Sequence, residues 1–179
     1  EQAFEAIGEP PFGEPAALWA ALTGPPDHDD PVGYFGAGFA RVAAQHGRSD
    51  VDPLALARAL RSAIDNRAVG FLPGAETVIQ QAAALGPIGI VTNGPEARQR
   101  VKLEALGIAD RFRTVVYAAG LARSKPHAEP FKRAVAELGV DRERTLYVGN
   151  SLAYDVAGAQ NAGLPVAWLR GDEELGDYE

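Results

Sequence analysis

The spacing of apolar residues along the chain changes near residue 70. Over residues 1–70, apolar side chains recur every three or four positions, as they do on one face of an amphipathic helix. This pattern predicts helices over 2–7, 14–22, 31–46 and 53–64, and no strand. Two of these helices begin with Asp-Pro, at 30–31 and 52–53, where the aspartate is expected to cap the helix and the proline to occupy its first position.

After residue 70, short apolar runs alternate with helical patterns. Strands are expected over 88–91, 114–117, 146–148 and 166–169. Helices are expected to begin near residues 73, 95 and 152, and another is expected to include residues 131–138. Strands that alternate with helices indicate a parallel sheet covered by helices. We therefore predict an α/β fold, with a Rossmann-like parallel sheet flanked by helices over 71–179 and a small all-helical domain over 1–70.

The segment 145–163, TLYVGNSLAYDVAGAQNAG, combines a strand, a tight turn and a helix. The helix is expected because apolar residues repeat at i, i+4 and i+7, at Leu152, Val156 and Ala159. Asp155 lies one helical turn beyond Ser151, so both side chains are expected to point the same way. A strand end beside a helix N-terminus is where open α/β sheets bind phosphate and metal ions.

Polar residues follow three of the expected strands. Thr92, Asn93 and Gly94 offer a hydroxyl, an amide and backbone N–H groups that can hold an anion. Lys125 can neutralise the charge of a transferring phosphoryl group. Taken singly, the first cluster also fits an ordinary turn and Lys125 a solvated surface charge. Because the carboxyl ends of parallel strands share one rim, we expect the clusters to lie together.

The third cluster is Asn150-Ser151 with Asp155. Asp155 is a candidate ligand for Mg²⁺, directly or through water, because Mg²⁺ prefers oxygen ligands. A helix cap with an acidic residue in the first turn is the alternative interpretation of this cluster.

Composition narrows the class of protein. The 179-residue chain is 46% hydrophobic and 23% charged, as in ordinary globular proteins, and no apolar run is long enough for a membrane span. It has no cysteine, which excludes disulfides and is compatible with a reducing compartment, so a cytoplasmic location is expected. A formal net charge of −7 argues against a nucleic-acid surface, although a local basic pocket can still bind a small phosphorylated ligand.

The order and spacing of the three clusters resemble the haloacid dehalogenase superfamily, whose members are mostly phosphatases. Thr92-Asn93 resembles the second motif of that family, and Lys125 with the downstream Phe131 resembles the third. The segment 148–151 with Asp155 resembles the fourth motif. The resemblance covers about residues 70–170, while residues 1–70 match only as a helical cap of the right length (type C1).

The resemblance implies a Mg²⁺-dependent phosphomonoesterase that acts on a small phosphorylated metabolite through an aspartyl-phosphate, as a monomer or homodimer. Thr92 and Lys125 are implied to be catalytic. The residues implied to bind the phosphate or the rest of the substrate are Thr92, Asn93, Gly94 and Lys125. The implied metal ligands are Asn150 and Asp155, with Ser151 supporting them.

The nucleophile motif of the family, Asp-x-Asp after an apolar strand, is not in this sequence. The nearest acidic cluster, residues 27–30, follows Gly-Pro-Pro and is expected to end as a helix cap. In the family the motif precedes the cap, so we expect it upstream of Glu1, on the strand between those that end at Thr92 and Asn150. The chain also has no methionine and begins inside a helical pattern, which favours a missing upstream segment. Without that segment, we expect the chain to be inactive.

Asn150 stands where the family usually has an aspartate that ligates Mg²⁺, so weaker Mg²⁺ binding is expected. A neutral residue here also permits a 2-haloacid dehalogenase that needs no metal. A degenerate member that binds a phosphorylated ligand or a protein partner is the non-enzymatic alternative. A serine hydrolase using Ser151 is disfavoured, since no histidine follows it in the chain.

Overall fold

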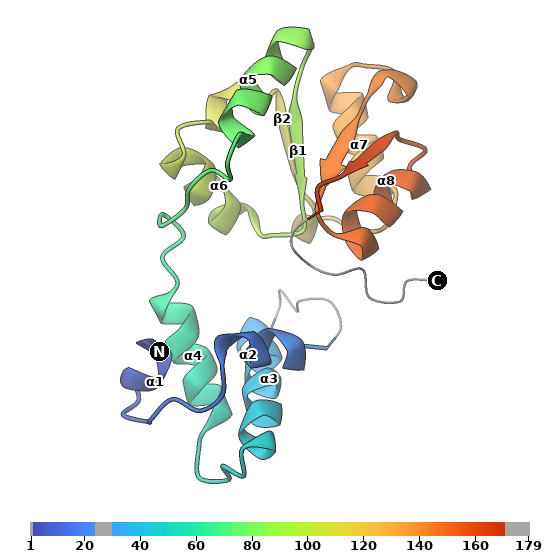
Figure 1. Ribbon diagram of the computed structural model, residues 1–179. Helices are drawn as coiled ribbons and strands as arrows, with labels where there is room; N and C mark the ends of the chain where they lie inside the picture. Colours follow the sequence, from blue (N-terminus) through green and yellow to red (C-terminus); the bar gives the residue numbers. More distant parts are fainter. Residues whose placement is uncertain (1, 24–29, 171–179) are drawn as a thin grey trace. The chain divides into compact units, whose positions relative to one another are not determined.

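The computed structural model describes residues 2–23 and 30–170, and it divides the chain into two compact units (Figure 1). Unit 1 is Glu1–Asp65 and unit 2 is Asn66–Glu179, compared with the boundary after residue 70 expected from the sequence. Of the acidic cluster 27–30, residues 27–29 lie outside the described residues.

Unit 1 contains only helices among its described residues: α1 (Gln2–Glu5), α2 (Pro15–Ala21), α3 (Pro31–Gln45) and α4 (Pro53–Ala63). Both expected caps are present. The Asp30 carboxylate accepts a hydrogen bond from the Gly33 N–H at 2.9 Å, and Asp52 accepts from the Leu54 N–H at 2.9 Å. These bonds satisfy N–H groups that have no partner inside the helix. The helices bury one core, made of Leu18, Phe39, Val51, Leu56 and Ala57.

Unit 2 alternates helices and strands, which confirms the predicted α/β class. Its longer elements are α5 (Ala75–Leu85), β1 (Gly89–Thr92), α6 (Glu96–Ala105), β2 (Thr114–Tyr117), α7 (Glu129–Leu138), β3 (Tyr147–Gly149), α8 (Ala157–Asn161) and β4 (Val166–Trp168). Short helical turns lie at η1 (Ala109–Arg111), η2 (Ala118–Gly120), η3 (Arg142–Arg144) and η4 (Leu152–Val156). In Figure 1, α5 and α6 lie on one side of the β1–β2 pair and α7 on the other.

The strands form two separate parallel pairs. β1 pairs with β2 from Gly89↔Thr114 to Thr92↔Tyr117, and β3 pairs with β4 from Tyr147↔Val166 to Gly149↔Trp168. The expected parallel sheet is therefore present as two halves. Among the described residues, the strands that end at Thr92 and before Asn150 share no neighbour.

Several apolar side chains of unit 2 are exposed. On α5, Val78 is 60% and Leu85 is 92% exposed. Leu146, just before β3, is 61% exposed, and Val148 within β3 is 55% exposed. These apolar side chains therefore have no cover among the described residues.

The buried core of unit 2 lies around α7 and α8. Phe131 is fully buried, and Ala159, Ala162 and Leu164 pack around it. A Cβ on Gly158 would lie 2.4 Å from the Phe131 ring and 3.2 Å from the Cα of Pro126. Only glycine permits this close approach, which seats α8 against α7 beside the loop that carries Lys125.

We predict that Gly158→Ala lowers the free energy of unfolding by about 1–3 kcal/mol, the usual cost of overpacking a core. Urea unfolding of the chain measures the change. Gly120→Ala is the control, because no atom lies within 4 Å of the Cβ that it would add. Equal stability of the two variants would show that the space at Gly158 is not limiting.

Candidate active site

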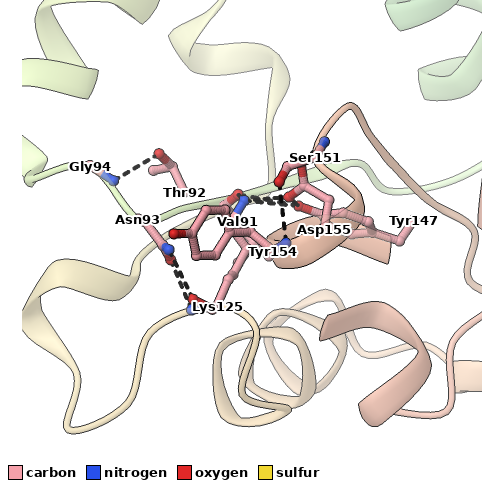
Figure 2. Close-up of polar contacts among 9 residues, drawn as sticks. All are labelled: Val91, Thr92, Asn93, Gly94, Lys125, Tyr147, Ser151, Tyr154 and Asp155. Atoms are coloured by element: carbon pink, nitrogen blue, oxygen red, sulfur yellow. Dashed lines mark hydrogen bonds and ion pairs between the residues drawn. The ribbon is translucent and has the colours of Figure 1, made fainter. Parts of the chain in front are cut away.

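The centre of the candidate site is the ammonium group of Lys125 (Figure 2). Its Nζ donates to Asp155 Oδ1 at 2.6 Å, to the Val91 carbonyl at 3.2 Å and to the Tyr147 hydroxyl at 3.3 Å. An ammonium has three N–H groups, so all of them have an acceptor. The side chains of Lys125 and Asp155 are only 11% and 7% exposed, so this is a buried ion pair.

Asp155 holds the other half of the ion pair. Its Oδ1 also accepts from the Tyr147 hydroxyl at 2.9 Å, and its Oδ2 accepts from the Ser151 N–H at 3.1 Å. Burial by itself would raise the pKa of Asp155, but the hydrogen bond from Lys125, the backbone bond from Ser151 and the charge of Lys125 together lower it. Asp155 is therefore ionised at neutral pH and balances the buried ammonium.

The backbone after β3 brings Asp155 to this position through a π-helical turn. The sequence predicted a regular α-helix from Leu152, but η4 is a π-helix in which the Val156 N–H donates to the Ser151 carbonyl at 3.0 Å. The regular helix α8 begins only at Ala157. The wider turn points Asp155 back at β3, where a Cβ on Gly149 would lie 2.4 Å from the Asp155 Cβ. Such turns often occur at functional sites.

Asn93 connects the end of β1 to the Lys125 loop. Its Nδ2 donates to the Lys125 carbonyl at 3.1 Å, and its Oδ1 accepts from the Lys125 N–H at 2.9 Å. This reciprocal pair fixes the backbone from which the ammonium extends. The structure thus gives Asn93 a positioning role, while the substrate-binding role predicted for it stays a prediction.

Thr92 and Gly94 form the turn at the end of β1. The Thr92 Oγ1 accepts from the Gly94 N–H at 3.1 Å, which leaves the hydroxyl proton free for another acceptor. Residues from the three polar clusters therefore meet at one rim, as expected from parallel strands. Their roles in phosphate binding stay predictions.

Tyr147 is the residue of this site that the sequence did not reveal. Its hydroxyl contacts both charges of the ion pair, yet in the sequence it is one member of the apolar run 146–148. One feature of the sequence could have indicated its role, because a tyrosine in a buried strand needs a hydrogen-bond partner for its hydroxyl.

The described residues do not complete a Mg²⁺ site. They contain no group of three or more His, Cys, Asp or Glu side chains that could hold a metal ion. Three of about four lone-pair sites on Asp155 are already used, and the Ser151 Oγ caps η4 by accepting from the Tyr154 N–H at 3.2 Å. Asn150 is exposed and offers only a neutral amide oxygen. The metal-binding roles of Asn150, Asp155 and Ser151 stay predictions.

A Rossmann-like α/β unit with a threonine, a lysine and an aspartate gathered at the ends of parallel strands is the arrangement expected for the haloacid dehalogenase family. Comparison with known families agrees. The chain belongs to the haloacid dehalogenase-like hydrolase family, whose sequence profile matches residues 25–169.

Among its relatives, two each cover about three quarters of this chain. One is the pyrimidine 5'-nucleotidase YjjG of Escherichia coli (strain K12), 34% identical over 146 residues, which are 77% of this chain and 64% of that protein. Another is a glyceraldehyde 3-phosphate phosphatase of Methanopyrus kandleri, 29% identical over 144 residues, 73% of this chain and 62% of that protein. The chain thus spans less than two thirds of the length of either relative.

The fold also matches solved structures. The HAD-hydrolase YfnB of Bacillus subtilis, crystallised with magnesium, superposes with a TM-score of 0.76 at 24% sequence identity, over 97% of this chain and 80% of that one. This likeness supports the fold. Across the described residues, none of the helices is both long and apolar enough to cross a membrane.

We predict that Asp155→Ala lowers the free energy of unfolding by about 3–5 kcal/mol, because it leaves the buried Lys125 ammonium without its counter-charge. The matched control is Glu104→Ala, which breaks the Arg100–Glu104 pair whose side chains are 66% and 54% exposed. That change should cost no more than about 0.5 kcal/mol. Urea unfolding compares the two, and a similar loss in both variants would contradict a special role for the buried pair.

Proposed function

We propose that the whole protein is a phosphomonoesterase that acts on a small phosphorylated metabolite. The observation that carries this proposal is the buried ammonium of Lys125, fixed at the end of β1 by its hydrogen bond to the carbonyl of Val91, the residue before Thr92. A fixed cation and hydrogen-bond donors are what a transferring phosphoryl group requires. The names of the two relatives, a nucleotidase and a phosphatase, support the same reaction class.

In the proposed reaction, Thr92 binds a phosphoryl oxygen and Lys125 neutralises the charge that develops on the group. Lys125 has no spare N–H, so one of its three acceptors must be exchanged for the phosphoryl oxygen. The Val91 carbonyl, a neutral acceptor at 3.2 Å, is the one we propose to be replaced. Asp155 and Tyr147 would then remain hydrogen-bonded to the ammonium.

The nucleophile is proposed to be a carboxylate on a strand that pairs with both β1 and β3. This rests on the two separate strand pairs and on the exposed apolar residues beside them. Its oxygen would form a bond to phosphorus as the alcohol oxygen leaves, and water would then release phosphate from the aspartyl-phosphate. Unit 1 is proposed to be the cap domain, which its all-helical composition supports.

Activity of the whole protein tests this proposal. We expect release of inorganic phosphate from a panel that includes a pyrimidine nucleotide and glyceraldehyde 3-phosphate. Lys125→Arg should lower kcat by roughly 10²–10³-fold, as does removal of one transition-state donor in other enzymes. Lys132→Arg, an exposed lysine on α7, is the control and should have no effect.

Two other outcomes would overturn the phosphatase proposal. Release of halide from 2-haloacids without release of phosphate, unaffected by a chelator, would identify a dehalogenase. Binding of phosphorylated compounds with no turnover would identify a non-catalytic member of the family.

Mg²⁺ is proposed as the cofactor, with the Asn150 amide oxygen as a weak ligand. A carboxylate binds a hard dication better than an amide does, because it carries a charge. We therefore predict that Asn150→Asp tightens Mg²⁺ binding by about tenfold or more, equivalent to about 1.4 kcal/mol. Calorimetric titration of the whole protein with Mg²⁺ measures this directly. Unchanged affinity would exclude residue 150 from the metal site.

A further inference from the structure

The Tyr147 hydroxyl lies beside the buried ion pair and contacts both of its charges (Figure 2). Its oxygen is 2.9 Å from Asp155 Oδ1 and 3.3 Å from Lys125 Nζ. An ammonium can only donate and an ionised carboxylate can only accept, so the hydroxyl accepts from Lys125 and donates to Asp155. Tyr147 therefore closes a ring of three hydrogen bonds with the ion pair.

The position of this hydroxyl is set by core packing. The Tyr147 ring meets the fully buried Phe131 edge to face, with the ring centroids 4.8 Å apart and the planes at 70°. Burial, followed by the charge of Asp155, raises the pKa of Tyr147, so the hydroxyl stays protonated and able to donate at neutral pH. A rigid ring thus carries a donor to a fixed point beside a flexible lysine side chain.

We propose that Tyr147 is a positioning residue for Lys125, whose hydroxyl holds the ammonium and the Asp155 carboxylate in the arrangement that meets a phosphoryl group. The kinetic part of this inference rests on the proposed phosphatase function. If a phosphoryl oxygen replaces the Val91 carbonyl, only Asp155 and Tyr147 remain as anchors. Loss of the hydroxyl would then leave the ammonium attached at one point and free to rotate about it.

Kinetics of the whole protein provide the first test. Tyr147→Phe removes one oxygen and keeps the ring that packs on Phe131. We expect kcat to fall about tenfold with KM changed less than about twofold, the pattern of a contact that matters in the transition state. Tyr117→Phe is the matched control, since Tyr117 lies on β2 and does not bond to Lys125 or Asp155.

Chemical labelling provides a second test that needs no activity. The chain has three lysines, Lys102, Lys125 and Lys132, so the other two serve as internal standards. Brief acylation with acetic anhydride, followed by mass spectrometry, compares their rates. Acylation requires the Lys125 amine to break its hydrogen bonds to its acceptors. Tyr147→Phe removes one of these bonds, so the acylation rate of Lys125 relative to the other lysines should rise by about threefold or more.

The two measurements separate the possible outcomes. A fall in kcat together with faster Lys125 acylation supports the inference. Faster acylation in a protein that hydrolyses no phosphate ester supports positioning by Tyr147 and overturns the proposed function instead. Unchanged acylation overturns the inference, whatever happens to kcat. If Tyr147→Phe does not fold, Tyr147→His replaces it, because the imidazole keeps a ring on Phe131 but is too short to reach Asp155, and the same rise in acylation is expected.

Discussion

The buried pair of Lys125 and Asp155 is the interaction on which unit 2 is organised. Removing two charges from water is costly, and only good geometry with further hydrogen bonds compensates for it. Here the charges lie 2.6 Å apart, and the remaining donors and acceptors are met by Val91, Tyr147 and Ser151. These partners come from the end of β1, from β3 and from the turn after β3. The ion pair therefore joins the two strand pairs, which share no backbone ladder in the described residues.

The close packing around this pair leaves no room for a side chain at two glycines. At Gly149 and Gly158, a Cβ would lie 2.4 Å from Asp155 and from the Phe131 ring, respectively. Gly149 at the end of β3 and Gly158 on α8 let the backbone approach its neighbours closely. The π-helical turn between them directs the Asp155 carboxylate toward Lys125. The geometry of the site thus depends on the packing of the core, because Phe131, which fills the core, also contacts the Tyr147 ring.

Much of this organisation can be predicted from the sequence. The four strands, the α/β class and both Asp-Pro helix caps follow from local patterns, because period, capping and turn chemistry involve only near neighbours. The gathering of Thr92, Lys125 and Asp155 also follows, since parallel strands end at one rim. The exposure of Val78 and Leu85 on α5 does not follow from the sequence, because an apolar stripe specifies a face but does not show whether another element covers it.

The sequence by itself determined the family, the alternation of strands and helices, and the chemical types of residue at the strand ends. Only the tertiary structure decided what those residues contact. It showed that Asn93 fixes the Lys125 backbone and that a π-helical turn replaces the expected start of the helix. It also showed that the Asp155 carboxylate accepts hydrogen bonds from Lys125, Tyr147 and Ser151. The physical reason is that hydrogen-bond partners far apart in the chain are selected by three-dimensional packing, which no local pattern records.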